Sequence, residues 1–308
     1  MVGEPLNLNE FQELARQALP KMYYDFYAGG AEDQYTLEEN MEAFRRIMIR
    51  PRILVDVSRI DLSTNVLGYN ISAPILIAPT ALHKLAHPEG EVVTARAAAA
   101  CKTIMALSFT SSCTLEEVAS SCNAVRFFQI YVYKRRDLSA LLVQRAERNG
   151  YKALVLTADS PRVGRKEADI KNKMTLPKLK NTERFLSLEA SSDIEWLSTI
   201  TNMPILIKGL LTREDAIKAV KVGVAGIVVS NHGGRQLDYA PATITVLEEI
   251  GRPVIYGLAA KGEYGVRQVI QMLKDELELT MALSGCPSVK DITRRHVRTQ
   301  RETLHSML

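Results

Sequence analysis

Short apolar runs alternate with amphipathic stretches from residue 73 onward. The apolar runs, each typical of a buried strand, are residues 74–78, 104–107, 125–131, 154–157, 205–208 and 227–229. Between two of them, residues 136–149 carry Leu138, Leu141, Leu142 and Ala146 at the spacing of one helix face. Repeated strand–helix units predict a parallel sheet in an α/β fold, and the length of the series favours a TIM-type β/α barrel over an open sheet.

The N-terminal part follows a different pattern. Residues 1–72 are expected to form a helical and connecting segment and residues 73–308 the barrel, so the 308 residues are predicted to make a single domain. Asn9 is predicted to cap a first helix that ends near Pro20. The aromatic run 23–27 is typical of a core, and because Gly29 and Gly30 follow it, it is also consistent with the wall of a pocket for a planar cofactor.

Composition and charge narrow the functional classes. The 46% of hydrophobic residues can supply a core, and a net charge of +4 from 39 basic and 35 acidic residues gives no reason to expect nucleic acid or an anionic membrane as partner. The four cysteines lack the Cys-x-x-Cys spacing of a metal site, so no metal is expected. No run resembles a signal peptide or a membrane span, which predicts a soluble protein that is not secreted.

Polar or chemically active residues follow the predicted strands. They are Thr80 beside Ala81, Ser108, Gln129 and Tyr131, Thr157 and Asp159, Lys208, and Ser230 with His232. The loops after parallel barrel strands converge on one face. Donors, acceptors and a cation gathered there predict a site for a flat, polar heterocycle.

Residues 230–239 form the most informative stretch. His232 can move a proton near neutral pH, and Arg235 offers a planar fork that suits a carboxylate. If Asp159 lies beside His232, its carboxylate would stabilise the imidazolium that forms on proton transfer. A plain loop histidine and a solvated arginine are the alternative that the sequence alone leaves open.

Several longer motifs carry a family resemblance. They are residues 78–81 (Ala-Pro-Thr-Ala), 128–131 (Phe-Gln-Ile-Tyr), 164–170, 204–209 and 230–238. With these motifs the chain resembles, from about residue 8 to its last residue, the FMN-dependent 2-hydroxy-acid oxidases, which include plant glycolate oxidase and long-chain enzymes. The resemblance implies oxidation of an (S)-2-hydroxy acid to a 2-oxo acid, with O2 reduced to hydrogen peroxide, in a homo-oligomer that would be a tetramer.

The resemblance also implies roles for individual residues. Those expected at the FMN are Pro79, Thr80, Ala81, Ser108, Gln129, Thr157, Lys208, Ser230, Gly251 and Arg252. His232 would be the catalytic base and Asp159 its partner. The substrate would contact Tyr131, Arg235, Phe26 and Lys166, with Arg235 holding its carboxylate.

Three of the site positions depart from glycolate oxidase. Phe26 replaces a substrate-binding tyrosine, and Thr110 replaces a bulky tryptophan. A lost hydroxyl and added space favour a medium- or long-chain acid over glycolate, which would connect the protein to fatty-acid metabolism. Lys166 stands where the family usually has arginine, so a point charge replaces a planar fork.

The largest departure is an internal deletion. In relatives, the helix that matches 241–249 is followed by a seventh strand, a glycine-rich loop, a helix and an eighth strand, whereas here residue 250 runs directly into Gly251-Arg252. The segment 180–193 is also shorter. The barrel is therefore expected to be incomplete, with raw strand edges and a weakened phosphate site, although 254–258 could partly fill the gap as a strand. A true variant with impaired FMN binding, a truncated gene or splice form, and an artificially shortened chain are all consistent with this.

The far C-terminal residues add a hypothesis about location. A long helical pattern over 263–281 precedes a basic stretch, and the chain ends Ser306-Met307-Leu308. This tripeptide resembles the peroxisomal Ser-Lys-Leu address, and a peroxide-forming oxidase suits the peroxisome.

Two other functions compete with the oxidase hypothesis. The first is a non-catalytic, truncated homologue that acts as a subunit or partner of intact oxidases. The second is an isomerase or aldolase on the same barrel, with Lys208 as a Schiff-base amine. The second leaves His232 and Arg235 without a role.

Overall fold

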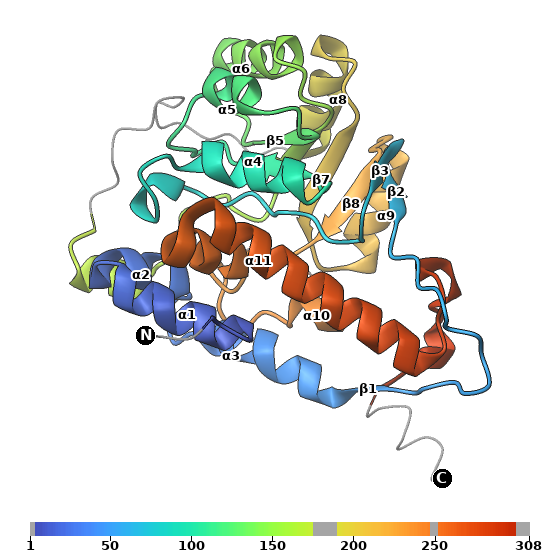
Figure 1. Ribbon diagram of the computed structural model, residues 1–308. Coiled ribbons are helices and arrows are strands. Elements are labelled where there is room, and N and C mark those ends of the chain that lie inside the picture. Colours follow the sequence, from blue (N-terminus) through green and yellow to red (C-terminus); the bar gives the residue numbers. More distant parts are fainter. Residues whose placement is uncertain (1–3, 175–189, 247–251, 300–308) are drawn as a thin grey trace.

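The structure is a computed structural model that describes residues 4–174, 190–246 and 252–299 (Figure 1). Its centre is a five-stranded parallel sheet in the order β4-β5-β6-β7-β8. The strands are β4 (Met105–Leu107), β5 (Arg126–Ile130), β6 (Leu154–Thr157), β7 (Ile205–Leu210) and β8 (Gly226–Val229). Within the described ranges the sheet does not close on itself, as expected for a barrel that lacks part of its strands.

The first predicted strand, 74–78, is wrong as a full strand. Only Ile77 pairs, through a single parallel bridge to Met105. It exchanges backbone hydrogen bonds with the Ile104–Ala106 segment on one side. A strand with one neighbour gains half of the ladder contacts, which explains why the pairing stays this short.

Helices alternate with the strands as the pattern predicts. They are α4 (Glu91–Ala100), α5 (Leu115–Ser121), α6 (Arg136–Arg148), α7 (Glu167–Lys171), α8 (Ala190–Ile200), α9 (Arg213–Lys221) and α10 (Thr243–Val246). Local sequence sets their starts: Thr114 and Glu117 form a capping box at α5, and Thr212 accepts from the Asp215 amide at α9.

The N-terminal segment is mostly helical. It comprises α1 (Leu8–Ala18), α2 (Lys21–Ala28), α3 (Tyr35–Glu42), η1 (Ala43–Arg46), β1 (Ile47–Ile49), β2 (Thr64–Val66) and β3 (Tyr69–Ile71). The cap of α1 is Asn7 and not Asn9, because Asn7 is extended and its side chain accepts from the Glu10 amide. β1 pairs with β9 (Val297–Thr299), which ties the N-terminal segment to the C-terminal end of the described chain.

A long C-terminal helix, α11 (Arg252–Ser284), replaces what could have been a strand over 254–258. It packs against α1 and α4 (Figure 1). Val254, Ile255 and Leu258 are buried in this helix, so their side chains are removed from water without pairing in a sheet. The helix is kinked at Lys261 and Gly262. Gly262 has a φ of 56°, a conformation that is strained for most residues with a side chain. Among the described residues, no helix is long and apolar enough to span a membrane.

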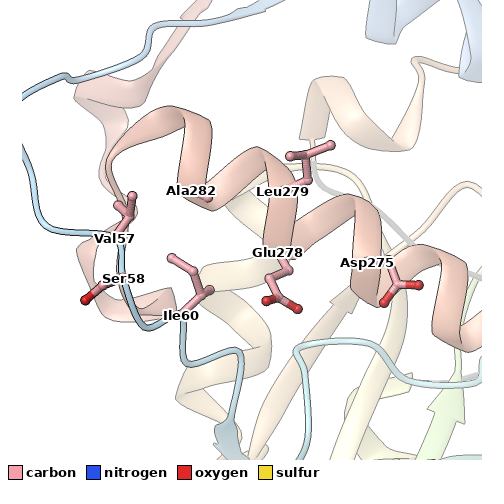
Figure 2. Close-up of a pocket in the computed structure, with 7 residues that line it drawn as sticks. All are labelled: Val57, Ser58, Ile60, Asp275, Glu278, Leu279 and Ala282. Carbon is pink, nitrogen blue, oxygen red and sulfur yellow. The ribbon is translucent and has the colours of Figure 1, made fainter.

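Burial along the sheet reflects its open edge. All residues of β5 and β6 are buried, whereas every residue of β8 is partly exposed. The central strands carry the core, and β8 has lost the cover that a further strand would give. A surface hollow of about 320 Å³ lies elsewhere, between residues 57–60 and the C-terminal part of α11 (Figure 2).

A buried carboxylate fastens the loops at the carboxyl ends of the first strands. Glu91, at the start of α4, is fully buried. It accepts from the amides of His83, Ser112 and Cys113 at 2.8–3.0 Å, and from the Ser112 hydroxyl at 2.7 Å. It therefore joins the loop after Ile77, which includes η2 (His83–Leu85), to the loop after β4. These two loops contain several of the residues expected at the cofactor.

We expect Glu91→Ala to lower the free energy of unfolding by about 3–5 kcal/mol, because it leaves buried amide donors without an acceptor. The matched control is Glu89→Ala, two residues earlier, since the Glu89 side chain is 54% exposed and pairs with Arg96. That change should cost less than about 1 kcal/mol. Equal losses in denaturant unfolding of the two variants would contradict the role given to Glu91.

Candidate active site

Polar side chains from successive strands meet at the carboxyl edge of the sheet. The Gln129 amide of β5 donates to the Thr157 hydroxyl of β6 at 3.0 Å and accepts from the Phe109 amide at 3.0 Å. The Ser108 hydroxyl, after β4, lies 3.4 Å from the same Gln129 oxygen. Each of these three polar side chains is buried, which is costly unless they are paired. The expected convergence of Ser108, Gln129 and Thr157 is thus present in the structure.

β7 contributes a cation. Lys208 is 4% exposed, its Nζ donates to the Ser230 hydroxyl at 3.0 Å, and it lies 3.7 Å from Oδ2 of Asp159. The β7–β8 pairing shifts register between Lys208 and Leu210, and Gly209 between them has a φ of 105°. A bulge of this kind changes the direction of neighbouring side chains. Here it allows Asp159 to approach, because a Cβ on Gly209 would come within 2.5 Å of that side chain.

Asp159 and His232 form the central pair of the site. Nδ1 of His232 lies 2.7 Å from Oδ1 of Asp159. Burial favours the neutral acid, but the His232 hydrogen bond and the Lys208 charge outweigh it and lower the pKa of Asp159. Burial and the Lys208 charge also lower the pKa of His232, against the opposing effect of Asp159. At neutral pH His232 is therefore a neutral imidazole whose Nδ1–H faces a carboxylate, which leaves Nε2 able to accept a proton.

The backbone at His232 is held in an uncommon conformation. His232 has a φ of 57°, in the left-handed region, and Gly233 and Gly234 follow with positive φ. The His232 amide donates to the Ser230 hydroxyl at 2.9 Å, which helps to fix this turn. Backbone strain of this kind is retained where a side chain must be aimed.

Arg235 follows β8 in the chain, and its side chain reaches the C-terminal end of α2. Its Nη1 and Nη2 donate to the carbonyl oxygens of Tyr27 and Phe26 at 2.8 and 2.5 Å, and its guanidinium carbon lies 5.2 Å from the centre of the Phe26 ring. Lys166 lies 4.2 Å from the same ring centre and is ion-paired with Asp169. Phe26, Lys166 and Arg235 therefore gather as expected, with two cations near the same aromatic ring.

The remaining predicted residues divide into two groups. Tyr131 follows β5, and Pro79, Thr80 and Ala81 lie in the loop after Ile77, where the Tyr27 hydroxyl reaches the Leu82 carbonyl at 2.6 Å. Gly251 lies outside the described residues. Arg252 is the first residue of α11, and its side chain is not described, so the expected phosphate contacts are untested. None of the predicted site residues lines the hollow of Figure 2.

The sequence reasoning overlooked Ser160. Its hydroxyl lies 3.2 Å from Nδ1 of His232, and the residue is 4% exposed. It follows Asp159 directly in the chain, so extending the rule on polar strand ends by one position would have found it. Gly209 was also missed, since only the fold reveals how closely Asp159 packs on it.

Parallel strands that present a histidine–carboxylate pair and a buried lysine at their carboxyl ends define an enzyme of the β/α-barrel class. A family model described as FMN-dependent dehydrogenase matches residues 15–250 and 249–299. The chain belongs to this FMN-dependent dehydrogenase family of oxidoreductases. The match breaks into two parts at residues 249–250, where the sequence predicts the deletion.

Individual relatives agree with this assignment. The chain is 62% identical over 359 aligned residues to the Arabidopsis thaliana protein named peroxisomal (S)-2-hydroxyacid oxidase GLO3, covering 98% of this chain and 99% of that one. It is 52% identical over 361 residues to the Oryza sativa subsp. japonica peroxisomal (S)-2-hydroxy-acid oxidase GLO4, covering 99% of each. The aligned lengths exceed the 308 residues of this chain, so these relatives contain residues that it lacks.

Solved structures show the same fold. An active chimera of (S)-mandelate dehydrogenase, as its G81A mutant, superposes with a TM-score of 0.92 at 32% identity, over 96% of this chain and 99% of that chain. A mandelate oxidase mutant with (S)-mandelic acid gives a TM-score of 0.91 at 33% identity, over 96% and 99% of the two chains. The fold class predicted from the sequence is confirmed.

FMN is the cofactor of this family, and the ring-binding half of the site fits it. The buried set of Lys208, Ser230, Thr157 and Gln129 offers one cation with hydroxyl and amide groups, as the polar edge of a flavin ring requires. Lys208 would supply a positive charge to offset the negative charge of a reduced flavin bound there.

Gly209→Ala should damage the site through Asp159. The variant adds backbone strain and a Cβ within 2.5 Å of Asp159, whereas Gly223→Ala, with a φ of 82°, adds the strain with no atom within 4 Å. We expect Gly209→Ala to be less stable than Gly223→Ala by about 1–3 kcal/mol in denaturant unfolding, the usual cost of overpacking. Equal stability of the two variants would show that Asp159 is not held against Gly209.

Proposed function

We propose that the protein oxidises (S)-2-hydroxy acids to 2-oxo acids and transfers the electrons to O2, with hydrogen peroxide as the second product. The single observation that carries this proposal is the neutral His232 hydrogen-bonded to Asp159 beside the buried cation Lys208. A base must accept one of the two protons that leave the substrate, and this imidazole is poised to do so. The names of the relatives support the same reaction.

Each side chain has a part in this proposal. When bound, FMN supplies the acceptor for the two electrons removed from C2 of the acid. His232 takes a proton through Nε2, and Asp159 stabilises the resulting imidazolium. Arg235 binds the substrate carboxylate through its guanidinium, which the carbonyl oxygens of Tyr27 and Phe26 hold in place. Tyr131 orients the acid, and Lys208 offsets the charge of the reduced cofactor.

The remaining cofactor contacts are part of the same proposal. They are Pro79, Thr80, Ala81, Ser108, Gln129, Thr157, Ser230, Gly251 and Arg252. Lys208 is held between the Ser230 hydroxyl and the Asp159 carboxylate. This arrangement argues against a Schiff-base role, in which the amine would bond to a carbonyl carbon instead.

We further propose that the preferred acids are of medium or long chain. The phenyl ring of Phe26 brings no hydroxyl to the site, and it is already in contact with Arg235 and Lys166. Thr110, whose hydroxyl lies 3.0 Å from that of Ser108, is a small side chain on the same edge. An apolar wall and a small neighbour favour an aliphatic tail over a small polar acid.

Peroxide release from 2-hydroxyoctanoate and 2-hydroxyhexadecanoate should exceed release from glycolate in an assay with added FMN. His232→Ala should lower kcat at least about 100-fold, because a general base contributes on this scale. Flavin absorbance that co-elutes with the variant would show that the loss is chemical. The proposal fails if the unaltered protein binds FMN yet oxidises no 2-hydroxy acid, and the role of His232 fails if the variant retains turnover.

Location and assembly complete the proposal. We propose a peroxisomal protein, because several relatives at 52–62% identity carry that word in their names. A fluorescent fusion that leaves Ser306-Met307-Leu308 free should co-localise with a peroxisomal marker, and a diffuse signal would contradict this. A homo-oligomer, with four subunits as the expected form, is proposed from the family resemblance, and light scattering of the purified protein tests it.

A further inference from the structure

Ser160 lies at the centre of the site without a role in the proposed reaction. It follows Asp159 after β6, and its hydroxyl oxygen is 3.2 Å from Nδ1 of His232. The carboxylate of Asp159, at 2.7 Å, is the stronger acceptor for the Nδ1–H. Ser160 can therefore be only a second acceptor on that hydrogen, and its own O–H is left to donate elsewhere.

The second neighbour of Ser160 is Tyr131. Burial and the Asp159 charge raise the pKa of Tyr131 to about 12, while the Ser160 hydroxyl acts in the opposite direction. This direction is consistent with a hydroxyl whose oxygen, and not its hydrogen, faces His232.

We propose that Ser160 is a positioning residue for His232, and that the Ser160 hydroxyl oxygen acts beside Asp159 as a second acceptor for the Nδ1–H. With two oxygens facing Nδ1, the imidazole keeps its hydrogen on Nδ1 and its lone pair on Nε2. The inference rests on the proposed function, since the imidazole matters because it takes a proton from the substrate.

The charged groups around the pair define what Ser160 adds. His232 faces Asp159, Lys208 and Arg235, and Tyr131 faces Asp159. Both cations disfavour the imidazolium, and Asp159 favours it. A second oxygen on Nδ1 acts in the same direction as Asp159 and raises the pKa of His232, because an acceptor binds the charged ring more tightly than the neutral one. Removing the Ser160 oxygen should therefore lower the pKa of His232.

The test compares Ser160→Ala, Ser160→Thr and the control Ser139→Ala. Ser139 is also fully buried, and its hydroxyl accepts from the Tyr133 amide, away from the His232–Asp159 pair. The pKa of His232 is followed by NMR of histidines labelled with 13C at Cε1, with the resonance assigned by its absence from a His232→Asn variant. The measurement is made with and without FMN, and kcat/KM is measured on the same samples.

We expect Ser160→Ala to lower the pKa of His232 by about 0.5 and kcat/KM about 3- to 10-fold, the scale of one hydrogen bond. Ser160→Thr, which keeps the hydroxyl, should restore both values towards those of the unaltered protein. Ser139→Ala should lower thermal stability and leave the pKa of His232 unchanged.

Two results would overturn the inference: an unchanged His232 pKa in Ser160→Ala, or the same shift in Ser160→Thr as in Ser160→Ala. Because the NMR titration needs no turnover, it judges Ser160 even if the protein oxidises no 2-hydroxy acid. In that case the proposed function fails on the assay alone, and the two failures are distinguished.

Discussion

The arrangement of the site depends on one carboxylate whose side chain is only 12% exposed. Asp159, after β6, lies 2.7 Å from His232 in the loop after β8 and 3.7 Å from Lys208 in β7, so it connects three neighbouring strands at their reactive ends. An ionised carboxylate this well buried requires opposite charge or donors nearby. The imidazole and the ammonium meet that requirement, and in return their own positions are fixed. Backbone strain at His232 and the bulge at Gly209 are tolerated because this pairing compensates for them.

The incomplete sheet separates the site into two halves with different support. Strands β4 to β8 are contiguous, so the side chains expected around the flavin ring keep their neighbours despite the missing segment. The cost of the deletion falls on the edges, where Ile77 pairs on one side and β8 is partly exposed. α11 covers the region with buried apolar residues but brings no strand. The residues expected around the flavin ring and the edges left by the deletion thus lie in different parts of the sheet.

Much of this could be predicted from the sequence, for identifiable reasons. The strands over 154–157 and 205–208 were predicted correctly because a short, continuous apolar run between polar turns is typical of a buried strand. The meeting of their polar ends followed from the topology of a parallel sheet. The first strand failed because its length depends on a second neighbouring strand, and the described residues provide none on its other side. Residues 254–258 fit both strand and helix, and tertiary burial chose the helix. Asn7 rather than Asn9 caps α1 because a cap needs an extended backbone and a side chain that accepts from an amide of the first turn, and Asn7 has both. Ser160 and Gly209 needed distances that spacing cannot provide.

The central claim is that five contiguous strands with their polar ends suffice to bind the flavin ring of FMN in an incomplete barrel. The most direct measurement is the visible absorbance spectrum of the purified protein after incubation with FMN and removal of free cofactor. The account predicts flavin bands that remain with the protein and change position or shape relative to free FMN. A folded protein that stays colourless after this treatment would contradict it.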